Sequence, residues 1–185
     1  MSMLDLGSGP TVHHLLPLLD LLEAVTVMDL LPENLDEISR WLHEPDTGHD
    51  WVPFAVECTE QLRSVGGLAG TDRLAPERLL LEMRRRLKVG GVVDLLSSSA
   101  RGTMTWDVVS LFFVACSSSA SPSDFASMVG NAFTHVRPGG VLELVHQLGA
   151  GRHAEVRPVG QRGEPDAPSI PTLPQICKCG KRMSG

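Results

Sequence analysis

The chain has no tyrosine, and aromatic residues make up only 4% of its 185 residues. Without tyrosine there is no Tyr-x-x-x-Lys pair, and no comparable arrangement for hydride transfer is visible, which argues against an NAD(P)-dependent oxidoreductase. The sequence also lacks an apolar run long enough to cross a membrane, because the best candidate, residues 15–22, is interrupted by Pro17 and Asp20. A membrane partner is therefore not expected.

Long basic runs are missing too, and the formal net charge is −6. A net negative charge repels phosphate, so nucleic acid is not an expected partner. The basic cluster within residues 84–88 falls at the end of a predicted helix, where positive charge complements the helix dipole. No basic segment precedes an apolar region at the N-terminus, so no secretory signal is predicted.

Cysteine is scarce as well, and its positions do not resemble a disulfide framework, which makes the cytoplasm the expected location. The four residues are Cys58, Cys116, Cys177 and Cys179. The last two, with His146 or His153, give only a weak zinc signal, because a single pair separated by one residue lacks the second pair of a usual zinc site. We expect no metal site.

The most informative segment that is present is residues 3–11, where a short apolar run ends in Gly7-Ser8-Gly9. A second apolar run, residues 24–28, leads to Asp29, twenty residues after Gly9. Strand, glycine turn, helix, strand and acid form the first half of a nucleotide-binding βαβ unit. The glycines let a ligand approach the backbone, and Asp29 can accept both hydroxyls of a ribose.

The wider pattern predicts an α/β fold, a Rossmann-like, doubly wound and mostly parallel sheet, because strands alternate with helices. Strands are expected over 3–6, 24–29, 92–96, 106–114 and 141–145, and helices over 11–23, 32–43, 76–88 and 121–136. Residues 51–58 are ambiguous between a short strand and an extended connection. Residues 1–148 read as one cofactor-binding domain, and residues 149–185, rich in proline and glycine, as an irregular or disordered tail.

Asp94 ends the third predicted strand, where a carboxylate suits the amino group of a base. A glycine turn, a ribose acceptor and a base acceptor together describe a site for an adenosine-containing cofactor. Val12 stands where the third glycine of Gly-x-Gly-x-x-Gly would be. A nucleoside cofactor without a pyrophosphate makes less demand on that position, which favours S-adenosylmethionine over NAD.

Three phrases, residues 4–11, 25–29 and 33–42, resemble the family of small-molecule N-methyltransferases that includes the nicotinamide, phenylethanolamine and indolethylamine enzymes. Residues 106–110 and 137–142 resemble the fourth and fifth strand motifs of that family. The resemblance covers residues 3–148. It implies a class I methyltransferase core, S-adenosyl-L-methionine as cofactor and methyl transfer to a small-molecule acceptor, an amine; it names no catalytic residue here.

The resemblance also implies contacts to the methionine and ribose of the cofactor. Gly7 would lie against the methionine part, Asp29 would accept the ribose hydroxyls, and Asn34 would add a contact unless it faces solvent. His13 stands where the family has a tyrosine, and either contacts the cofactor carboxylate or is a partly exposed helix histidine. Leu30 stands where the family often has an aromatic residue.

Adenine contacts would come from Asp94 at the edge and Leu95 at the face of the ring, although a strand-end acid such as Asp94 is also a common helix cap or surface residue. Phe112 would add a contact at the end of the fourth strand. The complete set of expected cofactor contacts is Asp5, Gly7, Ser8, Gly9, Thr11, His13, Asp29, Leu30, Asn34, Asp94, Leu95 and Phe112.

Two parts of the family pattern have no match here. The family has a helical cap before the glycine motif, where this chain has Met1 and Ser2, and a helix with an antiparallel hairpin after the fifth strand, which residues 149–185 do not resemble. One alternative is therefore a truncated or frame-altered methyltransferase that binds cofactor weakly without turnover. A remote alternative is the oxidoreductase.

Other candidate residues have plainer interpretations. Thr11 is expected to cap the helix that follows it, and His14 is expected to be structural. Residues 116–119 follow the fourth strand and are expected to line a pocket or form a loop, because no histidine or lysine adjacent in sequence activates the Cys116 thiol.

Overall fold

A computed structural model describes residues 1–44, 47–64, 75–102 and 104–146. The predicted tail and the Cys177–Cys179 pair lie outside these residues. The elements are β1 (Ser2–Leu6), η1 (His13–Leu21), β2 (Ala24–Asp29), α1 (Pro32–His43), α2 (Val52–Ser64), α3 (Pro76–Arg86), β3 (Leu87–Val92), η3 (Ser98–Ala100), β4 (Trp106–Phe112), α4 (Val114–Ser118), α5 (Pro122–Phe133) and β5 (Val136–Val145).

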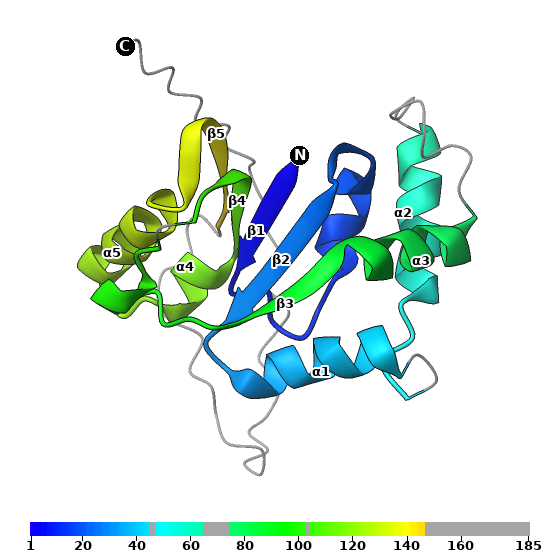
Figure 1. Cartoon of the computed structure of the whole chain (residues 1–185), viewed down its shortest axis with the longest axis horizontal. Helices are drawn as coiled ribbons and strands as arrows, with labels where there is room; N and C mark the ends of the chain where they lie inside the picture. Colours follow the sequence, from blue (N-terminus) through cyan, green and yellow to red (C-terminus); the bar gives the residue numbers. More distant parts are fainter. Residues whose placement is uncertain (45–46, 65–74, 103, 147–185) are drawn as a thin grey trace, which may run out of the picture.

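The strands form one five-stranded sheet in the order β3-β2-β1-β4-β5, and every neighbouring pair is parallel. The predicted Rossmann-like α/β fold is confirmed. The strand order reverses at β1, which pairs with β2 on one side and β4 on the other (Figure 1). In open α/β sheets ligands bind beyond the carboxyl ends of the strands at such a switch point.

Helices cover both faces of the sheet and bury two separate apolar clusters (Figure 1). On one face, Met3, Val25 and Val27 pack with residues of η1, α1, α2 and α3. On the other, Leu4 and Leu6 pack with residues of β4, α4, α5 and the 95–100 segment. Because successive residues of a strand point to opposite faces, β1 contributes to both clusters and is buried almost throughout.

Two strand predictions are wrong in their boundaries. The third strand was expected over 92–96 and the preceding helix up to 88, but α3 ends at Arg86 and β3 runs over Leu87–Val92, with Gly90 and Gly91 inside it. The pairing of β2 with β3 shifts register at these glycines, and Gly91 has a φ of 124°. The fifth strand was expected over 141–145, but β5 already begins at Val136; Gly139 within it has a φ of 79°, and the register with β4 shifts there.

Two helix predictions also need correction. The helix expected over 11–23 is the 3₁₀ helix η1, with Pro17 inside it, where proline lacks the N–H that an α-helix would use. Its N-cap is Val12, and no side chain caps it, so Thr11 is not the cap. Residues 51–58 are not extended: α2 begins at Val52, whose N–H donates to Asp50. None of the helices in the described residues is long and apolar enough to span a membrane.

Two charged side chains tie elements together away from the carboxyl edge. Asp107, at the start of β4, accepts from the Ser2 N–H and forms an ion pair with Arg137 on β5. The hydrogen bonds from Ser2 are the main reason that the pKa of Asp107 is lowered. Arg86, at the end of α3, donates from Nη1 to the carbonyls of Leu19 (2.6 Å) and Leu22 (2.8 Å), which closes the C-terminal end of η1.

Arg86→Gln should destabilise the protein, because carbonyls at the end of η1 lose a charged donor. We expect the free energy of unfolding to fall by about 1.5–3 kcal/mol, measured by urea denaturation. Arg85→Gln is the matched control, since Arg85 is exposed and bonds only to Glu82 one turn away, and should cost less than about 0.5 kcal/mol. Equal losses in the two variants would contradict this role of Arg86.

Candidate functional site

The site begins with the glycine turn that follows β1. Gly7 and Gly9 both adopt positive φ, 71° and 60°, a conformation that L-residues rarely adopt. The N–H of Gly7 donates to the carbonyl of Met28 at 2.8 Å, and that of Ser8 reaches the same oxygen at 3.4 Å. The turn is thus held against the end of β2.

The two glycines have different surroundings. A Cβ built on Gly7 would lie 2.3 Å from Val114 Cγ2, whereas one built on Gly9 would meet no atom within 4 Å. Gly7 therefore allows α4 to approach the turn, and Gly9 borders open space. Phe113, between β4 and α4, has a φ of 62°, which is uncommon for a bulky residue and strained by about 1–3 kcal/mol. This bend brings Val114 against the turn.

Asp29 joins the glycine turn to α1. Its buried carboxylate accepts from the Gly9 N–H on Oδ2 (2.8 Å), and from the Leu31 N–H and Asn34 Nδ2 on Oδ1 (2.9 Å each). The sequence placed Asp29 and Asn34 at this edge but did not indicate that they bond to each other. The structure brings Gly9, Asp29 and Asn34 into one network.

Asp5 precedes the glycine turn and is fully buried in β1, where its carboxylate contacts His14 instead of facing the carboxyl edge. Its Oδ2 is 2.8 Å from His14 Nε2, whose side chain is also almost completely buried. Ser110 on β4 and Glu143 on β5 follow Asp5 in register across the sheet. Burial, followed by the charge of Asp5, raises the pKa of Glu143. The sequence predicts a structural role for His14 and carries no signal for Glu143.

His13 begins η1 beside two aromatic residues, Trp51 just before α2 and Phe54 within it. Its ring stacks on Trp51, with centroids 5.8 Å apart, and lies 5.2 Å from Phe54. Its Nδ1 is buried and has no hydrogen-bond partner among the described residues. Burial and then the neighbouring charge of His14 lower the pKa of His13. The sequence did not indicate this aromatic surrounding, because α2 was not recognised as a helix.

The remaining expected contacts divide into exposed and buried positions. Leu30 is 54% exposed just after Asp29, and Asp94 is exposed beyond β3, with its Oδ1 accepting from the Leu96 N–H. Leu95, in contrast, is 5% exposed and packs in the cluster on the α5 side. Phe112 ends β4 and stacks on His14, with ring centroids 5.0 Å apart.

Two other expected contacts are held by bonds within the turn itself. The Ser8 hydroxyl donates to the Gly9 carbonyl, and the Thr11 hydroxyl donates to the Ser8 carbonyl. Both side chains therefore stabilise the turn.

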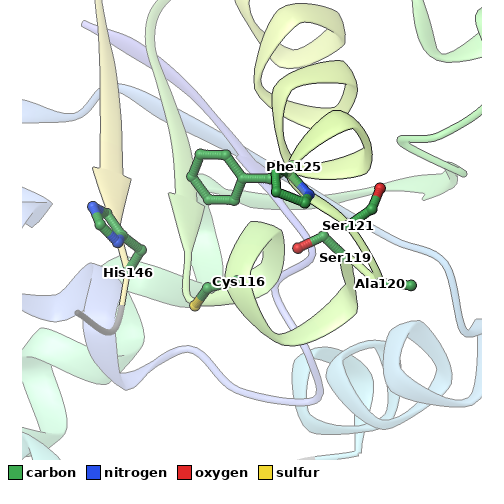
Figure 2. A pocket seen from close by; sticks show the side chains of 7 residues that line it. Cys116, Ser119, Ala120, Ser121, Phe125 and His146 are labelled. Atoms are coloured by element: carbon green, nitrogen blue, oxygen red, sulfur yellow. The ribbon is translucent and has the colours of Figure 1, made fainter. Parts of the chain in front are cut away.

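A cavity of about 290 Å³ opens beside the ends of β4 and β5. Figure 2 shows Cys116 and His146 on one side of it, with Phe125 and the serines of the 119–121 segment around the rest. The Phe125 and His146 rings meet edge to face, 5.9 Å apart. Residues 116–119 were expected to line a pocket or form a loop: Cys116 and Ser119 do line this cavity, but the segment up to Ser118 is helix α4 and not a loop. Within the described ranges, no group of three or more His, Cys, Asp or Glu residues could hold a metal ion.

Known proteins similar to this chain include a protein family and several curated N-methyltransferases. The model of the NNMT/PNMT/TEMT family matches residues 1–154. Nicotinamide N-methyltransferase of Sus scrofa is 28% identical over 149 residues, which is 79% of this chain and 53% of that protein. Phenylethanolamine N-methyltransferase of Homo sapiens is 29% identical over 154 residues, 80% of this chain and 51% of that protein. The chain thus spans about half the length of these curated relatives.

Among solved structures, the chain is similar to the glycopeptide N-methyltransferase MtfA complexed with S-adenosyl-L-methionine, with a TM-score of 0.47 and 18% identity. The similarity covers 78% of this chain and 43% of MtfA.

Alanine at Gly7 should be much worse tolerated than alanine at Gly9. In both variants an alanine must adopt positive φ, which lowers the free energy of unfolding by about 1–2 kcal/mol. Only Gly7→Ala also forces a methyl group into Val114, which costs about 1–3 kcal/mol more. Urea denaturation measures both losses. The double variant Gly7→Ala/Val114→Ala should show a favourable coupling, since the clash is removed, and simple additivity would contradict the contact.

The lowered pKa of His13 predicts a pH dependence of stability. Below the unfolded pKa of about 6.5, the unfolded chain takes up a proton that folded His13 resists, so the free energy of unfolding falls as the pH drops. We expect His13→Gln to reduce the difference in urea midpoint between about pH 7.5 and pH 5.5. His43→Gln, at an exposed position on α1, is the control; an unchanged difference in His13→Gln would contradict the argument.

Proposed function

The chain belongs to the NNMT/PNMT/TEMT family, and from this premise we propose that it binds S-adenosylmethionine and transfers its methyl group to a small-molecule amine. The names of its relatives, N-methyltransferases for nicotinamide and phenylethanolamine, support this proposal. The observation that carries it is the open glycine turn bonded to Asp29 at the carboxyl edge of the sheet. Residues 1–148 are the proposed cofactor-binding domain.

The residues present fit such a cofactor. The open space over Gly9 leaves room for a ligand to lie on the backbone of the turn, and a side chain there would fill it. His13, next to the turn, carries a ring nitrogen without a partner among the described residues. We assign the methionine part of the cofactor to this side, with His13 donating to its carboxylate.

We assign Asp29 to the ribose. The hydrogen bonds that Asp29 already accepts limit how many ribose hydroxyls it can bind. A carboxylate offers about four lone-pair positions, and protein donors occupy three of them. One ribose hydroxyl can be accepted without any change, and a second requires a donor to leave. The Asn34 amide is the donor that can rotate away, since the other two belong to the backbone, so Asn34 would turn toward the cofactor as Asp29 takes the diol.

The adenine is assigned to the side of β3. Asp94 is exposed, and only its Oδ1 is bonded, so Oδ2 remains to accept from the amino group. Because Leu95 packs inside the core, the face of the ring would instead meet exposed apolar side chains at the ends of β2 and β3. Leu30 and Val92, 54% and 58% exposed, are the candidates.

The acceptor is assigned to the cavity at the ends of β4 and β5 (Figure 2). Its described lining carries hydroxyls, a thiol and two rings but no carboxylate, which suits a neutral amine. When bound, S-adenosylmethionine supplies a methyl group on a sulfonium, so the methyl passes to the amine nitrogen as the bond to sulfur breaks. The chain's own contribution is to position the two partners and exclude water, and no general base is required for a neutral amine.

Calorimetry with S-adenosylmethionine and S-adenosylhomocysteine tests this function. We expect both to bind the whole chain, and Asp29→Asn to weaken binding by about tenfold or more, the effect of losing a charged acceptor. Asp36→Asn, at an exposed position on α1, is the matched control and should bind like the unmodified chain. Absence of binding at about 1 mM ligand would contradict the proposal.

Turnover distinguishes the proposal from its alternatives. Incubation with labelled S-adenosylmethionine and a panel of small amines should label at least one of them. Cofactor binding without any labelled product would support a chain that binds but does not react. Titration with NADH tests the oxidoreductase alternative. If that alternative were correct, NADH would bind and S-adenosylmethionine would not.

A further inference from the structure

A second groove lies between α5 and the segment that follows β3. It has a volume of about 420 Å³. Ser98 and Arg101 line it on one side, and Ser127, Gly130 and Asn131 of α5 line it on the other. The proposed methyltransferase site uses none of these side chains.

Arg101 gives this groove a positive charge. It is the only charged side chain in the lining, and no described carboxylate pairs with it. Its Nε donates to Asn131 Oδ1 at 3.1 Å, while its terminal N–H groups have no acceptor among the described residues. The hydroxyls of Ser98 and Ser127 are two further donors in the same lining.

Asn131 orients the exposed Arg101 side chain through the bond to its Nε. Asn131 is 6% exposed, and its Nδ2 donates to the carbonyls of Leu95 (2.8 Å) and Ser97 (3.2 Å). These bonds leave Oδ1 directed at the Arg101 Nε. This bond restricts the guanidinium before any ligand arrives, which lowers the entropic cost of binding.

Gly130 keeps the groove open. It lies inside α5, where glycine is less favourable than alanine. Packing does not require a glycine, since a Cβ there would meet no atom within 4 Å. The missing side chain instead leaves free volume in the groove.

We propose that this groove binds the oxyanion group of a small molecule, a phosphate or a carboxylate. Arg101 would hold two of its oxygens through its terminal N–H groups, the bidentate geometry in which arginine binds such anions. Ser98 and Ser127 would donate to the remaining oxygens. The proposal does not depend on the methyltransferase activity.

Titration of the ¹⁵N-labelled whole chain tests the proposal, with no cofactor present, so that its outcome is independent of S-adenosylmethionine binding. Inorganic phosphate and, separately, acetate are added at constant ionic strength, because the two anions distinguish a phosphate ligand from a carboxylate. We expect saturable shifts of the Arg101 Nε–H signal and of the Ser127 and Gly130 amides with at least one anion. Shifts that do not saturate, or that spread over the whole surface, would overturn the proposal.

Two variants of different kinds separate anion binding from folding. Arg101→Gln should weaken binding of the anion by about tenfold or more. Gly130→Leu fills the groove while leaving the Arg101–Asn131 bond intact, and leucine favours the helix, so it should remain folded and lose binding as well. Arg78→Gln, at an exposed position on α3, should bind like the unmodified chain. Unchanged binding in Gly130→Leu, or an equal loss in Arg78→Gln, would overturn the proposal.

Discussion

The carboxylate of Asp29 is the interaction on which the carboxyl edge depends. It accepts from the turn after β1, from the backbone that enters α1 and from a side chain of α1. The turn after β1 and the start of α1 are thereby both fixed to the end of β2, and the N–H groups of Gly9 and Leu31 are satisfied. A negative charge at the start of α1 is also favourable for the helix dipole. The same group that would bind a ribose is thus already structural.

The alternation of strands and helices was predictable because each strand of a sheet covered on both faces is a short apolar run between turn residues. The residues at which β3 and β5 begin and end were not predictable in this way. Both contain a glycine with positive φ at a point where the register with the neighbouring strand shifts. A turn and a bulge use the same residue types, and only the neighbouring strand decides between them. The chain alone carries no signal for that choice.

In the candidate site, too, the sequence predicts the place of a residue along the chain but not which side chain it contacts. Spacing placed Gly9 and Asp29 at one edge, because the strand ends of a parallel sheet coincide there. It could not show that Leu95 turns into the core, since burial depends on the contact of the 95–100 segment with α5. Nor could it show that His14 pairs with Asp5, because that pair depends on how η1 packs over β1. Position along a strand was predictable, and the partner of each group was not.

The central position of β1 has a consequence for the order in which the protein is made. Its pairing with β2 closes a short loop, whereas the bond from Ser2 to Asp107 spans 105 residues. During synthesis one edge of β1, with its unpaired N–H and carbonyl groups, stays open until β4 leaves the ribosome. Chain growth is therefore the period in which this sheet is most exposed to pairing with another strand, and chaperones that cover apolar strand edges should matter most before residue 112 emerges.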